Sequence, residues 1–141
     1  MHISTLVDDV QKVVEELRKN HGEFTLAMLY NPNSLTASSS WNLILSAPWT
    51  DAMGKVETTH LIAYALHDGM DPDNEPAISR VTVLKTTDPF VRDMTFLYPV
   101  ASPGGVPISQ VIAGDISEGS AFVFYSKKNS SDLSKTRNAR R

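Results

Sequence analysis

Apolar residues recur at intervals of three and four over the first twenty positions of the chain. This stripe consists of Ile3, Leu6, Val7, Val10, Val13, Val14 and Leu17. A period of 3.6 residues places such positions on one face of a helix, and Gly22 is a typical stop just beyond them. The pattern therefore predicts an amphipathic helix over residues 4–20.

Five later segments have the alternation or the β-branched and aromatic content that is typical of strands. They cover residues 24–30, 41–47, 77–85, 108–114 and 120–126. The last two are separated by a short stretch with a glycine, which predicts a hairpin.

Two further helices are predicted between these strands, over residues 52–68 and 89–98. The second of them begins after Asp88, which is followed at once by Pro89. An aspartate N-cap with proline at the first helical position is a strong start signal, because the proline lacks an N–H that would have no partner there.

The resulting order of elements is α-β-β-α-β-α-β-β, with about three helices. A strand, a helix and a strand in succession form a right-handed crossover when the strands share a sheet. We therefore expect the strands 41–47 and 77–85 to be parallel and the flanking pairs to be antiparallel. The fold class that follows is α+β: a single domain over residues 1–126, with a mixed sheet of about five strands and helices mainly on one face.

Composition narrows the possible chemistry. The chain has 141 residues and no cysteine, which excludes disulfides, thiolate metal sites and cysteine nucleophiles. We expect no metal and no cofactor. No apolar run reaches the roughly 20 residues of a membrane span, and the start of the chain is acidic rather than basic, unlike a signal peptide. The composition predicts a soluble protein of the cytoplasm with no membrane partner.

Charge is distributed unevenly along the chain. Residues 127–141 contain six basic residues and one acidic residue, although the net charge of the chain is −3. The segment contains Leu133 as its one leucine and no aromatic residue, so we expect a disordered tail. A nucleic-acid accessory role through this tail is one hypothesis, but the acidic remainder of the chain disfavours nucleic acid as a partner.

Polar residues follow both strands of the expected parallel pair and form the first candidate site. They are Trp49, Thr50 and Asp51 after the first strand, and Lys85, Thr86 and Thr87 after the second. The carboxyl ends of parallel strands meet at one edge of a sheet, where ligands often bind and where helix N-termini offer free N–H groups.

The competing interpretation of this edge is structural. Threonine and aspartate before a helix are the residues that N-capping requires, without any ligand. Asp51 and Asp88 would also repel an anion, and neither turn is rich in glycine as a phosphate-binding loop would be. We favour capping, with Lys85 and Thr86 as the residues worth testing as ligand contacts.

The second candidate is one face of the predicted 52–68 helix. Glu57, His60, Tyr64 and His67 are spaced by three, four and three residues and form a single stripe. Glu57 and His60 could act as a carboxylate–imidazole pair in general base chemistry. The two histidines lie about 10.5 Å apart along the helix, too far to share one metal ion. A solvated helix face is the simpler interpretation.

The function we predict is a non-catalytic binding or protein-interaction domain that forms a homodimer, with an unidentified protein or small molecule as a further partner. The apolar strands of the C-terminal hairpin suggest self-association through a sheet edge, and the helix over residues 4–20 offers a second surface. Whether the chain is an enzyme stays open. The alternative is a small hydrolase-like enzyme with its site at residues 46–51 and 85–88.

Overall fold

The structure is a computed structural model, and it describes residues 3–32, 40–101 and 105–128. In chain order the elements are α1 (Ile3–His21), β1 (Leu26–Asn31), β2 (Trp41–Ser46), α2 (Pro48–Met53), α3 (Lys55–Gly69), the short 3-10 helix η1 (Glu75–Ala77), β3 (Ile78–Val83), α4 (Pro89–Leu97), β4 (Val106–Ile108) and β5 (Ser120–Ser126). Within the described ranges, no helix combines the length and the apolar content that a bilayer crossing requires.

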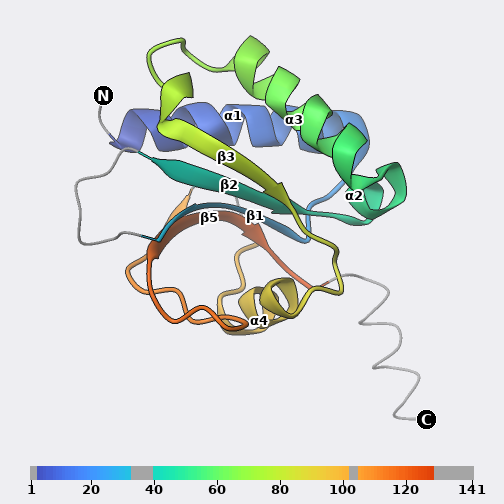
Figure 1. The fold of residues 1–141 in the computed structure, drawn as a ribbon, viewed down its shortest axis with the longest axis vertical. Coiled ribbons are helices and arrows are strands. Elements are labelled where there is room, and N and C mark those ends of the chain that lie inside the picture. Colours follow the sequence, from blue (N-terminus) through green and yellow to red (C-terminus); the bar gives the residue numbers. More distant parts are fainter. Residues whose placement is uncertain (1–2, 33–39, 102–104, 129–141) are drawn as a thin grey trace.

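The five strands form one mixed sheet in the order β3-β2-β1-β5-β4 (Figure 1). β2 and β3 are parallel, with Leu43 opposite Val81. β1 pairs antiparallel with both β2 and β5, and β4 pairs antiparallel with β5. The predicted α+β class, the mixed five-stranded sheet and the parallel pair are therefore confirmed.

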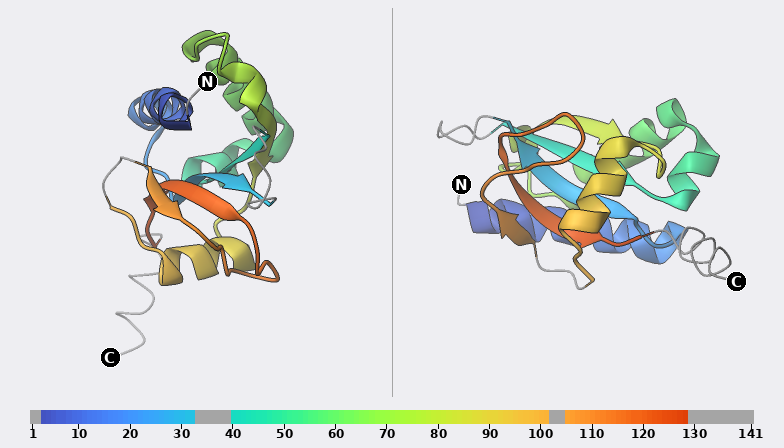
Figure 2. Two further views of the ribbon diagram at one scale, coloured as in Figure 1. Left: turned by 90° about the vertical axis from the view of Figure 1, so that its left-hand side faces the viewer. Right: turned by 90° about the horizontal axis from the view of Figure 1, so that it is seen from below.

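Helices cover both faces of the sheet, as the two turned views also show (Figure 2). α1, α2 and α3 lie over one face, and α4 lies under the other (Figure 1). Every residue of β1 is buried. Along this strand Leu29 packs into the core beneath α1 and α3, whereas Met28 packs into the core with Phe90 and Met94 of α4. A central strand is buried on both faces, so its residues are apolar at consecutive positions.

The prediction of one helix over residues 52–68 is wrong in its first turn. The helical segment begins earlier, at Pro48, and it is interrupted at Gly54, which has a φ of 96° and separates α2 from α3. Such a φ belongs to the left-handed region, where residues with a Cβ are strained and glycine is not. The break allows α3 to leave α2 in a new direction and to pack beside α1 (Figure 1).

The predicted C-terminal hairpin is also wrong in part. The strand expected over residues 108–114 is only three residues long, Val106–Ile108, and the chain then continues as a loop to β5. The reason is burial: Val111 and Ala113 insert into the core with Phe90 instead of extending a ladder along β5. A turn with mutual backbone hydrogen bonds between Ala113 and Ile116 closes this loop.

This topology removes one route to self-association that the sequence suggested. β5 is flanked by β1 and β4 and is not an edge strand. β4 is the edge on that side, but it has three residues and contains Pro107, which cannot donate a hydrogen bond to a new strand. Pairing of two chains along the C-terminal hairpin is therefore disfavoured.

Candidate functional site

The ends of β2 and β3 lie at the same edge of the sheet, and one side chain connects the segments that follow them. The Asp51 carboxylate accepts a hydrogen bond of 2.6 Å from the Thr86 hydroxyl. It also accepts from the Thr86 backbone N–H, at 3.2 and 3.3 Å to its two oxygens. The expected juxtaposition of the two turns thus exists, and Asp51 uses its oxygens to hold them together.

Thr50 and Trp49 are engaged in the fold as well. The Thr50 hydroxyl accepts from the Ala47 N–H at 3.0 Å and donates to the Ala47 carbonyl at 2.8 Å, which closes the first turn of α2. The indole N–H of Trp49 donates to the Gly22 carbonyl at 3.1 Å. Its ring stacks on His21, with centroids 4.8 Å apart. Trp49 therefore docks the end of α1 against α2.

The stretch after β3 combines a cap with two exposed side chains. Asp88 caps α4 by accepting from the Phe90 N–H at 2.9 Å, as its position before the proline predicts. The Asp88 N–H in turn donates to the Lys85 carbonyl at 2.9 Å. The side chains of Lys85 and Thr87 are exposed. Most polar groups of this edge thus serve turns and caps, which supports the structural interpretation over a ligand site.

The second candidate stripe lies on the outer side of α3. Glu57, His60, Tyr64 and His67 are all exposed. The Nδ1 atom of His67 lies 3.2 Å from both carboxylate oxygens of Glu75. Among the described residues, the structure records no hydrogen bond or ion pair between Glu57 and His60.

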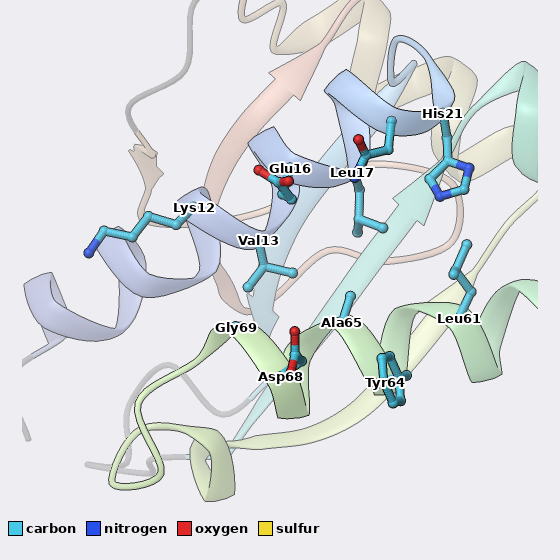
Figure 3. A pocket seen from close by; sticks show the side chains of 11 residues that line it. Lys12, Val13, Glu16, Leu17, His21, Leu61, Tyr64, Ala65, Asp68 and Gly69 are labelled. Atoms are coloured by element: carbon cyan, nitrogen blue, oxygen red, sulfur yellow. The ribbon is translucent and has the colours of Figure 1, made fainter.

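A groove between α1 and α3, not expected from the sequence, opens in the helical layer (Figure 3). It has a volume of about 420 Å³. Its lining residues are Lys12, Val13, Glu16, Leu17, Asn20, His21, Leu61, Tyr64, Ala65, Asp68 and Gly69. None of the six residues predicted at the strand-end edge is among them.

Apolar residues such as Val13 and Leu17 and charged residues such as Lys12 and Asp68 together line the groove. The two helices approach closely at Gly69, where an added Cβ would lie 3.0 Å from the Cγ2 atom of Val13. Ala65 is the other small residue on that side of α3. Small residues on one side of a helix, such as Ala65 and Gly69, are the sequence signal for a close approach of another helix. The sequence does not show that this other helix is α1; only the tertiary structure does.

A cluster of titratable groups connects α1 to the end of β5. The Tyr125 hydroxyl donates to the Glu15 carboxylate, and Arg18 bonds Glu15 at 3.0 Å and Glu23 at 2.8 Å. Burial and the bond to Glu15 raise the pKa of Tyr125 to about 12. Burial alone would raise the pKa of Glu15, but the hydrogen bonds from Tyr125 and Arg18 outweigh it and lower this pKa.

The first two basic residues of the predicted tail are part of the folded body. Lys127 forms an ion pair with Glu23 at 2.9 Å, and this pair together with Arg18 lowers the pKa of Glu23. The Nζ atom of Lys128 lies 5.6 Å from the centroid of the Phe96 ring. The rest of the predicted tail, residues 129–141, lies outside the described residues.

In the described segments, no group of three or more His, Asp or Glu side chains is arranged to hold a metal ion. No protein-family model matches the sequence, and comparisons with curated proteins and with solved structures found no match either.

Proposed function

We propose that this chain is a non-catalytic interaction domain of the cytoplasm that self-associates as a homodimer. The observation that carries the proposal is the helical layer: α1 and α3 border a groove of about 420 Å³, and Tyr64 on its rim is 70% exposed. A large aromatic side chain that is exposed on a helical layer is the kind of residue that anchors protein interfaces.

The polar groups of the sheet edge support this proposal indirectly. Asp51 is occupied by Thr86, and Asp88 is occupied by the Phe90 N–H. These carboxylates have partners already, so binding a substrate there would require breaking contacts that order the turns. A partner can cover the exposed His60 and Tyr64 side chains of α3 without a rearrangement of this kind.

Light scattering after size exclusion tests the proposal. Over a concentration series up to tens of micromolar, we expect the measured mass to rise from that of one chain to that of two chains. A mass of one chain of 15.5 kDa at every concentration would contradict self-association.

A hydrolase-like enzyme at the strand-end edge is the second candidate, because one observation favours it. His21 stacks on Trp49, so a histidine lies next to the predicted edge residues. Rates of hydrolysis of simple nitrophenyl esters by the wild type, His21→Ala and Lys85→Ala distinguish the two candidate functions. Loss of hydrolysis in both variants would support an enzyme, and equal background rates in all three would contradict it.

A further inference from the structure

The outer surface of α3 carries few charges for a helix at the surface of a protein. We call the outer α3 face the stripe formed by Val56, Glu57, His60, Ala63, Tyr64 and His67, all of them exposed. Val56 is 71% exposed and Tyr64 is 70% exposed. Glu57 is the one carboxylate among these six residues, which include no lysine or arginine. A second carboxylate, exposed Asp68, lies beside the stripe, one turn after Tyr64.

This composition is unusual for a helix face that meets only water. α3 already buries Thr58, Ile62 and Leu66 on its inner side. An ordinary surface helix then carries charged residues on its opposite side, as α1 does with Lys12, Glu16 and Lys19. The outer α3 face instead carries Tyr64 among apolar and imidazole groups, and aromatic residues such as tyrosine are enriched in the core of an interface.

Four residues of the stripe have a spacing that is the same in both directions along the helix. The steps from Glu57 to His60, Tyr64 and His67 are three, four and three residues, symmetric about Ile62. In two antiparallel helices related by a two-fold axis, a residue faces the one equally far on the other side of the midpoint. A second copy of α3 would therefore place its His67 opposite Glu57 and its Tyr64 opposite His60.

We propose that the homodimer forms through the outer α3 face, with two copies of α3 packed antiparallel about a two-fold axis near Ile62. The inference rests on the proposed self-association and assigns the surface that performs it. Glu57 pairs with the partner's His67, and His60 pairs with the partner's Tyr64. Each contact occurs twice, as a two-fold interface requires.

The chemistry of these pairs is complementary. A carboxylate accepts a hydrogen bond from an imidazole N–H, and a phenol can donate to an imidazole nitrogen. The Nδ1 atom of His67 already lies beside Glu75 at 3.2 Å. Donating to a carboxylate of the second copy through Nε2 as well requires the imidazolium form, in which both ring nitrogens carry a proton. Ala63, next to the midpoint, has a side chain small enough to let the two helices approach.

The other exposed aromatic residue offers a weaker case and a useful control. Phe96 on α4 is 69% exposed, on the opposite layer of the molecule. Its ring already has a cation beside it, the ammonium of Lys128 at 5.6 Å.

The absence of cysteine from the sequence allows a direct test by disulfide cross-linking. In the proposed pair, residue 57 of one copy faces residue 67 of the other, but residues 57 of the two copies are about 15 Å apart along the axis. A disulfide requires Cα atoms within about 7 Å. Under mild oxidation, the double variant Glu57→Cys/His67→Cys should become a covalent dimer, and each single variant should not.

A second measurement does not depend on disulfide formation. Ala63→Arg places a charge at the centre of the interface on an exposed helical position, where arginine is a good helix former. We expect this variant to lose at least tenfold in dimer affinity by light scattering, while Phe96→Arg keeps the wild-type affinity. Far-UV circular dichroism verifies that each variant is folded.

The outcomes separate this inference from the proposed function. A wild type that stays monomeric contradicts both. A wild-type dimer that persists in Ala63→Arg, with no cross-link in the double variant, contradicts the α3 interface but leaves self-association intact. Cross-linking of the single variants as readily as the double one would indicate random collision and would also overturn the α3 interface.

Discussion

The carboxylate of Asp51 accepts hydrogen bonds from both the hydroxyl and the backbone N–H of Thr86, the shortest of them 2.6 Å. Asp51 belongs to α2, and Thr86 follows β3. The contact therefore joins two segments that are 35 positions apart in the sequence and that leave the sheet at the same edge. It fixes the exit of the polypeptide from β3 before α4 begins.

Removing the Asp51 carboxylate should destabilise the protein at the edge of the sheet where β2 and β3 end. We expect Asp51→Ala to lower the free energy of unfolding by about 1–2 kcal/mol, because a backbone N–H and a hydroxyl lose a charged acceptor. Urea unfolding followed by circular dichroism measures the change.

Thr86→Val provides the matched control, since it deletes the hydroxyl and keeps the backbone N–H. Its effect should be smaller than that of Asp51→Ala, and the double variant should be less destabilised than the sum of the single ones, because both changes remove the same contact. Strict additivity would show that the two side chains do not interact in solution.

The sequence was sufficient to place Asp51 and Thr86 at one edge, but not to pair them. The parallel arrangement of β2 and β3 follows from the crossover rule, which depends only on the order of the elements. The specific partner of Asp51 depends on where α2 begins. The sequence pattern predicted a helix that starts at residue 52, whereas α2 starts at Pro48. If the helix began at residue 52, Asp51 would be its N-cap instead of accepting hydrogen bonds from Thr86.

Asp88 was identified correctly because its signal is local. Asp88→Ala should lower the free energy of unfolding by about 0.5–2 kcal/mol, the usual effect of a lost N-cap, whereas Asp88→Asn should be nearly silent. Thermal unfolding of the two variants distinguishes them. Equal losses would mean that the charge of Asp88, and not its role as an acceptor for Phe90, stabilises the fold.

Lys85 is expected to contribute little to stability, because it is an exposed cation at a strand end. Lys85→Ala should keep the unfolding free energy within about 0.5 kcal/mol of the wild type. If this variant also kept every binding activity found for the wild type, the purely structural role of the edge would be supported. A loss of binding at unchanged stability would instead assign Lys85 to a ligand site.

The groove and the loop before β5 could not be predicted for a different reason. Both depend on contacts between segments far apart in the sequence. Val111 is apolar and lies in a strand-like run, but it inserts beside Phe90 of α4 instead of joining a ladder. Local periodicity cannot distinguish these two ways of burying a side chain. The width of the groove likewise depends on how Gly69 meets Val13.

Gly119, just before β5, tests the packing of that loop. It has a φ of 99°, and an added Cβ would lie 2.7 Å from the Tyr30 ring and 2.8 Å from the Asn31 carbonyl oxygen. Gly119→Ala should destabilise the protein by about 1–3 kcal/mol, through strain and overpacking together. Equilibrium unfolding in urea measures this change in the free energy of unfolding.

Gly54 supplies the control for Gly119. Its φ is 96°, but an added Cβ would meet no atom within 4 Å. Gly54→Ala therefore reports the backbone strain without the clash and should destabilise less. If the two variants lost equal stability, the close approach of Tyr30 to Gly119 would not contribute.

The predicted tail can be tested by truncation after Lys128. We expect removal of residues 129–141 to change the melting temperature by no more than about two degrees, because this segment offers almost nothing apolar to bury. Lys128 is retained in the truncated chain because it lies beside Phe96. Differential scanning calorimetry of both chains makes the comparison, and a large drop would indicate that the tail docks on the body.

The bond from Tyr125 to Glu15 predicts a loss of stability in alkaline solution. The pKa of Tyr125 is raised from its ordinary value of about 10 to about 12 in the folded protein. A raised pKa means that the native state holds this proton more tightly, so its contribution is complete below pH 10 and is lost between pH 10 and pH 12. Tyr125→Phe should cost about 1–2 kcal/mol at pH 7, and its difference from the wild type should shrink across that window in urea titrations at successive pH values. A difference that stays constant up to pH 12 would contradict the bond.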